Sequence, residues 1–271
     1  MQLIFTGCYT AASLFSGERI VGLILQGQHV IVDHSCRDWL LTSPEGNPTI
    51  EKSGDLKVYS VFRRQLLSGK HRRDRQQRKP GDNCPLIYAL KRKEGLFTDI
   101  ASIRRLYDSF GFILHNIATQ EPAGYQHIIS MPSAHNISHI TGRRFARKFQ
   151  ARHITDFLRK VTVEEAFMLL DKADIDIENN RRIEFRIKLQ AKEVGLNGKF
   201  SLKSIPTKFR GILPPLRLNI VPTLTFLPTR ILIVDDLMAT GTTLSTAAHI
   251  ISQQYPGATV DAACLFSSSG R

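Results

Sequence analysis

Apolar residues in the first part of the chain form short runs of strand length. Residues 19–25 and 29–33 lie on either side of a turn centred on Gly27, and this arrangement predicts a β-hairpin. Residues 57–62 form a third run of the same kind. We therefore expect a β-rich N-terminal region.

From residue 84 onward, helical spacing alternates with apolar strand-length runs. The spacing predicts helices over residues 86–91, 100–114, 142–149, 164–170, 178–190 and 243–253. The runs predict strands over residues 127–131, 154–158, 230–235 and 258–266. Thr98 is expected to cap the second helix. Such alternation is typical of an α/β fold with a mostly parallel sheet flanked by helices.

The most basic segment of the chain lies between these two patterns. Residues 63–79 contain eight Lys or Arg residues and one Asp. The segment is interpreted as a linker or, alternatively, as an arm that binds nucleic-acid phosphates, although it has no aromatic residue for base stacking. We thus divide the chain into a β-rich region (1–62), a basic linker (63–83) and an α/β core (84–271).

Composition narrows the classes of partner and compartment. Lys and Arg number 37 against 24 Asp and Glu, which gives a net charge of +13 and favours nucleotides, pyrophosphate or nucleic acid as partners. No apolar run approaches the roughly 20 residues of a membrane helix, and the N-terminus does not resemble a secretory signal. A cytoplasmic protein is expected. The scattered cysteines are expected to be reduced thiols: Cys8, Cys36, Cys84 and Cys264.

The strongest chemical signal lies in residues 231–244. The apolar run 231–234 predicts a buried strand that ends at Asp235 and Asp236, where open α/β sheets bind their ligands. A loop of small hydroxylated residues around Gly241 follows, and then a helix begins. Such a loop can direct N–H and hydroxyl groups at a phosphate. Because acids would repel that phosphate unless they faced hydroxyls or a metal, the pattern indicates a sugar phosphate.

This segment resembles the phosphoribosyl pyrophosphate (PRPP) motif of type I phosphoribosyltransferases. The resemblance implies that Asp235 and Asp236 hold the two ribose hydroxyls, lie beside Mg²⁺ and are the catalytic acids. It implies a cradle for the 5-phosphate formed by Ala239, Thr240, Gly241, Thr242 and Thr243. Enzymes of this family transfer the phosphoribosyl group of PRPP to a nitrogenous base, through an oxocarbenium-like transition state, and release pyrophosphate.

The rest of the core is similar to the ComF-like branch of this superfamily. The similar segments occur in order at residues 85–91, 129–132, 142–146 and 197–202. The resemblance implies a type I phosphoribosyltransferase-like sheet with the N-terminal β-rich region as the "hood", the part that supplies the base pocket in these enzymes. No residue of that region identifies the acceptor base.

Positive side chains are needed where pyrophosphate leaves. We assign this role to Arg143 and Arg144, because guanidinium groups match phosphate geometry; a solvated helix face is the alternative. The loop over residues 132–136 lacks the paired glycines that are usual for a pyrophosphate loop, and Arg144 stands at a glycine position of the branch pattern. These departures favour PRPP binding over catalysis.

Two weaker groups of residues complete the set of candidates. His135 and His139 are four residues apart and could share a metal only on one helix, so a polar loop near the pyrophosphate site is the favoured interpretation. A second group is interpreted as a solvent-facing stripe of a helix, with a mobile lid as the alternative: Arg181, Arg182, Arg186 and Lys188.

Three functions follow from these observations. The intact acidic pair favours a PRPP-dependent, magnesium-dependent transferase. The net charge favours either a nucleotide-sensing module that grips DNA or RNA through residues 63–79, or an effector of competence or phage defence. A homodimer is expected only by analogy with the superfamily.

Overall fold

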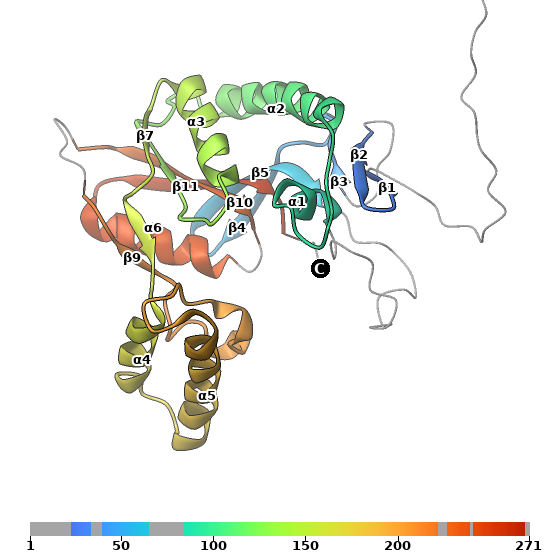
Figure 1. The fold of residues 1–271 in the computed structure, drawn as a ribbon. Coiled ribbons are helices and arrows are strands. Elements are labelled where there is room, and N and C mark those ends of the chain that lie inside the picture. The colour runs from blue at the N-terminus through green and yellow to red at the C-terminus, as the bar shows by residue number, and fades with distance from the viewer. Residues whose placement is uncertain (1–22, 34–39, 65–83, 222–226, 239–240, 269–271) are drawn as a thin grey trace, which may run out of the picture.

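The protein is described by a computed structural model, shown in Figure 1. The structure describes residues 23–33, 40–64, 84–221, 227–238 and 241–268. It is an α/β protein whose central, mixed sheet is mostly parallel and is flanked by helices. Among the described residues, no helix combines the length and apolar character needed to cross a membrane.

The central sheet has seven strands, six of which follow one another in the order β3-β5-β11-β10-β6-β7. Their bounds in that order are Leu40–Leu41, Leu56–Arg64, Thr259–Phe266, Arg230–Leu237, His127–Ser130 and Arg152–Ile154, and β4 (Thr49–Ser53) also pairs with β5. Strands β5, β11, β10, β6 and β7 run parallel to one another, whereas β3 and β4 are antiparallel to β5. The β10 run Ile231 to Val234 is fully buried because both faces of the sheet are covered.

The predicted hairpin is confirmed as a small antiparallel sheet of β1 (Leu23–Gln26) and β2 (His29–Val32). Gly27 in its turn has a φ of 60°, which favours glycine. The boundary drawn after residue 62 does not follow the sheet, since β5 lies beside β11 within it. Pairing between strands two hundred residues apart leaves no local pattern, and the strand was therefore assigned to the wrong part of the fold.

Helices cover both faces of the sheet (Figure 1). The bounds on one face are α1 (Pro85–Leu90), α2 (Ile100–Gln120) and α3 (Ile137–Phe149), and α6 (Thr242–Gln254) covers the other. These helices were predicted, with α2 and α3 longer than expected. The cap of α2 is Asp99 and not Thr98, because the Asp99 carboxylate accepts a hydrogen bond from the backbone N–H of Ser102 at 2.6 Å.

A smaller lobe is inserted between β7 and β10. Its elements are β8 (Leu158–Lys160), α4 (Val163–Asp171), α5 (Ile177–Val194), the 3₁₀ turns η3 (Leu202–Ser204) and η4 (Thr207–Phe209), and β9 (Leu216–Leu218). The lobe has a hydrophobic core of its own, which includes Ile183, Ile187 and Phe200. The single strand predicted over residues 154–158 is wrong: β7 ends at Ile154, and β8 begins at Leu158 and pairs with β9.

Two sets of sequence predictions lie partly outside the described residues. Residues 65–83, which contain most of the basic segment, are not among them, and neither are Cys8 and Cys36. Cys84 and Cys264 are buried free thiols, as predicted.

Candidate functional site

Asp235 and Asp236 lie at the carboxyl end of β10, where the sequence pattern predicted them. The Oδ1 atom of Asp235 accepts hydrogen bonds from the Ser138 hydroxyl at 3.2 Å and from the backbone N–H of Asp236 at 2.7 Å. Asp236 is only 7% exposed, and its Oδ2 atom pairs with the Lys91 ammonium at 2.7 Å. The two carboxylates are thus held in fixed but different environments.

The protonation of Asp235 is sensitive to this crowding. Its burial, together with the neighbouring charge of Asp236, raises the pKa of Asp235 to about 6, although the hydrogen bonds from Asp236 and Ser138 act in the opposite direction. A cation or a hydroxyl donor beside this carboxylate would favour its charged form. The pair of acids is therefore suited to a ligand that brings such groups.

Lysines from three separate segments lie in this region, and we call them the lysine group: Lys91, Lys93, Lys160 and Lys199. Lys91 pairs with Asp236, Lys160 interacts with both acids and with Lys199, and Lys93 acts on the neighbouring His135. Burial lowers the pKa of Lys160, the charges of Asp235 and Asp236 raise it, and those of Lys199 and Lys91 lower it again. These mutual effects mean that the side chains share one electrostatic environment. Lys91 and Lys160 act on the two acids, and Lys93 and Lys199 add positive charge next to them, on His135 and Lys160, so the region as a whole is suited to an anion.

His135 belongs to the same environment. Burial lowers its pKa, and the charges of Lys93 and Lys91 lower it further. His135 lies before the first turn of α3, whereas His139 lies within that helix and packs against His153 with tilted rings whose centroids are 5.0 Å apart. The two histidines therefore do not lie on one helix and do not form the metal pair that their spacing allowed.

The phosphate cradle predicted after β10 is only partly described. Ala239 and Thr240 lie outside the described residues, and Thr242 is the first residue of α6. Gly241 has a φ of 76°, and a Cβ at this position would lie 2.4 Å from the Ser53 hydroxyl. Only glycine fits this conformation and this close contact without strain.

The end of β4 contributes a hydroxyl to the same region. Oγ of Ser53, the last residue of this strand, lies 3.3 Å from the Oγ of Ser245 in the first turn of α6. The sequence analysis did not single out either serine. Nothing in the local sequence could have joined them, because they are separated by 192 residues.

The two arginines assigned to pyrophosphate have other neighbours. The Arg144 guanidinium stacks on the ring of Tyr107 in α2, 4.0 Å from its centroid. Arg143 is exposed, and its charge contributes to lowering the pKa of His153, after burial and the charge of His139. The cations that act on the acids are Lys91 and Lys160, and of these Lys91 lies in a segment that the sequence analysis used.

The residues at this site fit a magnesium ion in type. Mg²⁺ prefers carboxylate oxygens, uses one or two of them and takes its other ligands from water and substrate phosphates. Asp235 and Asp236 supply two adjacent carboxylates, and the raised pKa of Asp235 reports a repulsion that a cation would relieve. No group of three or more His, Cys, Asp or Glu side chains suited to a metal occurs within the described part of the chain.

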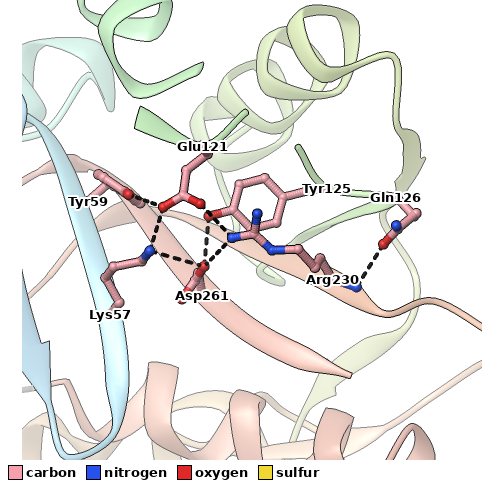
Figure 2. Close-up of polar contacts among 7 residues, drawn as sticks. All are labelled: Lys57, Tyr59, Glu121, Tyr125, Gln126, Arg230 and Asp261. Atoms are coloured by element: carbon pink, nitrogen blue, oxygen red, sulfur yellow. Dashed lines mark hydrogen bonds and ion pairs between the residues drawn. The ribbon is translucent and has the colours of Figure 1, made fainter. Parts of the chain in front are cut away.

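A second charged cluster lies at the opposite end of the parallel strands (Figure 2). Glu121 accepts hydrogen bonds from Lys57 and Tyr59, and from Arg230 at 2.6 Å. Asp261 accepts a hydrogen bond from Tyr125 at 2.8 Å and pairs with Arg230 at 3.3 Å. We call these six residues the Glu121 network.

The Glu121 network is electrically balanced, with two carboxylates and two cations. Burial alone would raise the pKa of Glu121, but hydrogen bonds from Lys57, Tyr59 and Arg230 lower it to about 2. The side chains of Glu121 and Asp261 are 8% and 6% exposed. Both carboxylates are buried and already have hydrogen-bond and ion-pair partners. The network is therefore suited to a structural role rather than to binding a ligand.

Comparison with known proteins assigns this chain to no family. Neither the protein-family models nor the curated proteins that were compared match this chain.

Proposed function

We propose that the protein binds PRPP with Mg²⁺ and transfers its phosphoribosyl group to a nitrogenous base. One observation carries the proposal: two adjacent carboxylates at the end of β10 share their environment with Lys91 and Lys160, and α6 begins six residues after the second of them. This combination offers acids to sugar hydroxyls and positive charge to phosphates. It matches the chemical needs of the PRPP motif that residues 231–244 resemble.

The residues have separate tasks in this proposal. Asp235 and Asp236 accept hydrogen bonds from the ribose hydroxyls, and residues 239–243 bind the 5-phosphate at the start of α6. In the reaction the bond from the anomeric carbon to pyrophosphate breaks, a bond to the base nitrogen forms, and the nitrogen loses its proton. Mg²⁺, when bound, neutralises part of the charge that leaves with pyrophosphate.

We assign the pyrophosphate to the lysine group in place of Arg143 and Arg144. Lys91 and Lys160 are the members whose charges act on the acids, and Arg144 is engaged by Tyr107. Charge that builds up on the leaving group would then meet ammonium groups that are already in position.

The inserted lobe is the natural hood in this proposal, instead of the N-terminal region. It supplies Lys160 and Lys199 to the neighbourhood of the acids. Strands β3, β4 and β5 belong to the central sheet, so this part of the region expected to form the hood supports the site from within. An acceptor base would therefore bind between the sheet and the lobe.

Calorimetric titration with PRPP, with and without Mg²⁺, tests the proposal. The wild type is expected to bind PRPP more tightly with Mg²⁺, and the Asp235→Asn plus Asp236→Asn variant to lose at least 100-fold in affinity. Asp171→Asn plus Asp174→Asn removes the same charge from exposed positions of the lobe and is the control. Equal binding by both variants would refute the site.

Turnover is measured separately, as pyrophosphate released from PRPP in the presence of individual bases. Release that depends on one base identifies the acceptor and supports a transferase. PRPP binding without release for any purine, pyrimidine or pyridine base would refute the transfer step and leave a nucleotide sensor.

A further inference from the structure

Helix α5 exposes a face that the lobe does not use. Ile183, Ile187 and Gln190 point into the lobe and are buried. On the opposite side, Phe185 is 61% exposed and Leu189 is 41% exposed. Phe185 and Leu189 are one helical turn apart, so they form a small apolar patch on the solvent side of α5.

Cations surround this ring on both sides. Of the positions three and four residues from Phe185, Arg181, Arg182 and Lys188 are basic and the fourth is Leu189. Arg186 follows Phe185 directly, and the acids of the helix are Glu178, Glu184 and Glu193. The five cations of this face are Arg181, Arg182, Arg186, Lys188 and Lys192, all of them exposed. Lys188 pairs with Glu184 at 2.6 Å, whereas no ion pair within the described residues involves the three arginines.

We infer that this face of α5 binds single-stranded nucleic acid. The guanidinium groups of Arg181, Arg182 and Arg186 are suited to successive phosphates, which they can contact through paired N–H groups. The Phe185 ring is suited to stack on an unpaired base, since every base has a π-face. An aromatic ring flanked by cations is the combination that the basic segment over residues 63–79 lacks.

Duplex DNA and acidic proteins fit this face less well. Bases in a duplex are already stacked on one another, so Phe185 would gain no partner there. An acidic protein would pair with the arginines but would leave no reason for an exposed phenyl ring at their centre. The observations therefore favour a strand with unpaired bases.

This inference is independent of the proposed transferase. The face belongs to α5, in the lobe below the sheet in Figure 1, whereas the acids lie at the end of β10 within the sheet. Loss of nucleic-acid binding should therefore leave PRPP binding unchanged. Nucleic-acid binding by α5 and PRPP binding at the end of β10 can therefore be refuted independently of each other.

Fluorescence anisotropy with labelled 20-mers of dT and of U, at several salt concentrations, tests the inference. Arg181→Gln plus Arg182→Gln plus Arg186→Gln is expected to lose at least about tenfold in affinity and to reduce the slope of log K against log salt by about 2, since three phosphate contacts disappear. Phe185→Ala is expected to lose about fivefold or more with an unchanged salt slope, because it removes stacking alone.

The control variant is Arg104→Gln plus Arg147→Gln plus Lys148→Gln, which removes the same charge from exposed positions of α2 and α3. It should bind nearly as well as the wild type. If it loses as much affinity as the α5 variant, the binding follows net charge and the inference is wrong. Equal loss by Phe185→Ala on single strands and on a 20-base-pair duplex would also overturn it. Comparison of dT and U then tells whether DNA or RNA is preferred.

Discussion

Charged clusters lie at both ends of the parallel strands, and they differ in how completely their acids are paired with cations. At the beginning of the strands, the Glu121 network matches two carboxylates with two cations and buries both acids. At the other end, Asp236 pairs with Lys91, whereas no ion pair within the described residues involves Asp235, and burial and the charge of Asp236 raise the pKa of Asp235. A cluster whose acids are all paired gains little from a ligand. A cluster with an unpaired acid is stabilised by a ligand that supplies the missing charge and hydrogen bonds.

Strand β10 contributes to both clusters. It begins at Arg230, within the Glu121 network, and carries Asp235 and Asp236 near its end. The apolar residues between them are fully buried and fix the distance between the two clusters. The comparison teaches that the number of charges says less about function than whether they are paired.

The largest effect on stability is expected from a substitution within the Glu121 network. Glu121→Ala leaves Lys57 and Arg230 without their shared acid, and we expect the free energy of unfolding to fall by about 3 kcal/mol. The Lys57 side chain is 34% exposed, so the loss should lie at the low end for a buried pair. Urea denaturation measures it. Asp108→Ala, on the exposed side of the same helix, should change stability by less than about 0.5 kcal/mol.

The pH dependence of the same network gives a second measurement. Because its pKa is about 2 in the folded protein and near 4.5 when unfolded, Glu121 contributes stability above pH 4.5. That contribution is lost as the pH falls from 4.5 towards 2. Glu121→Gln should therefore show a smaller loss of stability over this range than the wild type. Parallel curves for the two proteins would contradict the network's role.

At the unbalanced end, Gly241→Ala is expected to cost about 2 kcal/mol in stability or in PRPP binding. The φ of 76° is strained for alanine, and its Cβ would lie 2.4 Å from the Ser53 hydroxyl. Adding Ser53→Ala should recover part of the loss, since it removes the clash but not the strain. Gly257→Ala, where a Cβ meets nothing within 4 Å, is the control.

The Lys160→Gln variant tests whether the lysine group, and not Arg144, binds the pyrophosphate. We expect it to weaken PRPP binding about tenfold, which corresponds to about 1.4 kcal/mol. Arg144→Gln should leave the affinity unchanged, because Arg144 stacks on Tyr107. Calorimetric titration of both variants decides between lysine and arginine, and the reverse result would restore the assignment made from sequence.

The smallest effect concerns Asp235 in the protein without PRPP or Mg²⁺. A carboxyl whose pKa is raised by folding from 3.8 to about 6 costs stability above pH 6, and this cost disappears below pH 4. The rise in pKa corresponds to about 3 kcal/mol, but Asp235→Asn also weakens the hydrogen bonds that the carboxylate accepts from Ser138 and Asp236. The net rise in the free energy of unfolding at pH 7.5 should therefore be on the order of 1 kcal/mol. The gain should vanish at pH 4. A gain that does not vary with pH would have another cause.

The features that the sequence predicted well are local ones. The hairpin around Gly27, the strand that ends at Asp235 and Asp236, and helix α6 each follow from periodicity and turn residues within a short window. The parallel character of the sheet followed from the alternation of helices and strands. The specific phosphoribosyltransferase fold stays a prediction.

Features that depend on distant segments could not be predicted in the same way. The place of β5 in the central sheet rests on its pairing with β11, and the lysine group combines segments around residues 91, 160 and 199. Arg144 was assigned to a phosphate because its local pattern is basic, and only the packing of α2 on α3 brings it to Tyr107. The separate core of the lobe depends likewise on contacts between α4 and α5.

The antiparallel pair β8–β9 has a mechanical consequence. The chain enters the lobe through Leu158–Lys160 and leaves it through Leu216–Leu218, so these two strands form a neck between the lobe and the sheet. Leu158 and Leu216 of this neck belong to the same buried cluster as Ile231 and Ile233 of β10, so the neck is packed onto the sheet. The packing that anchors the lobe thereby also sets where Lys160 stands relative to the end of β10.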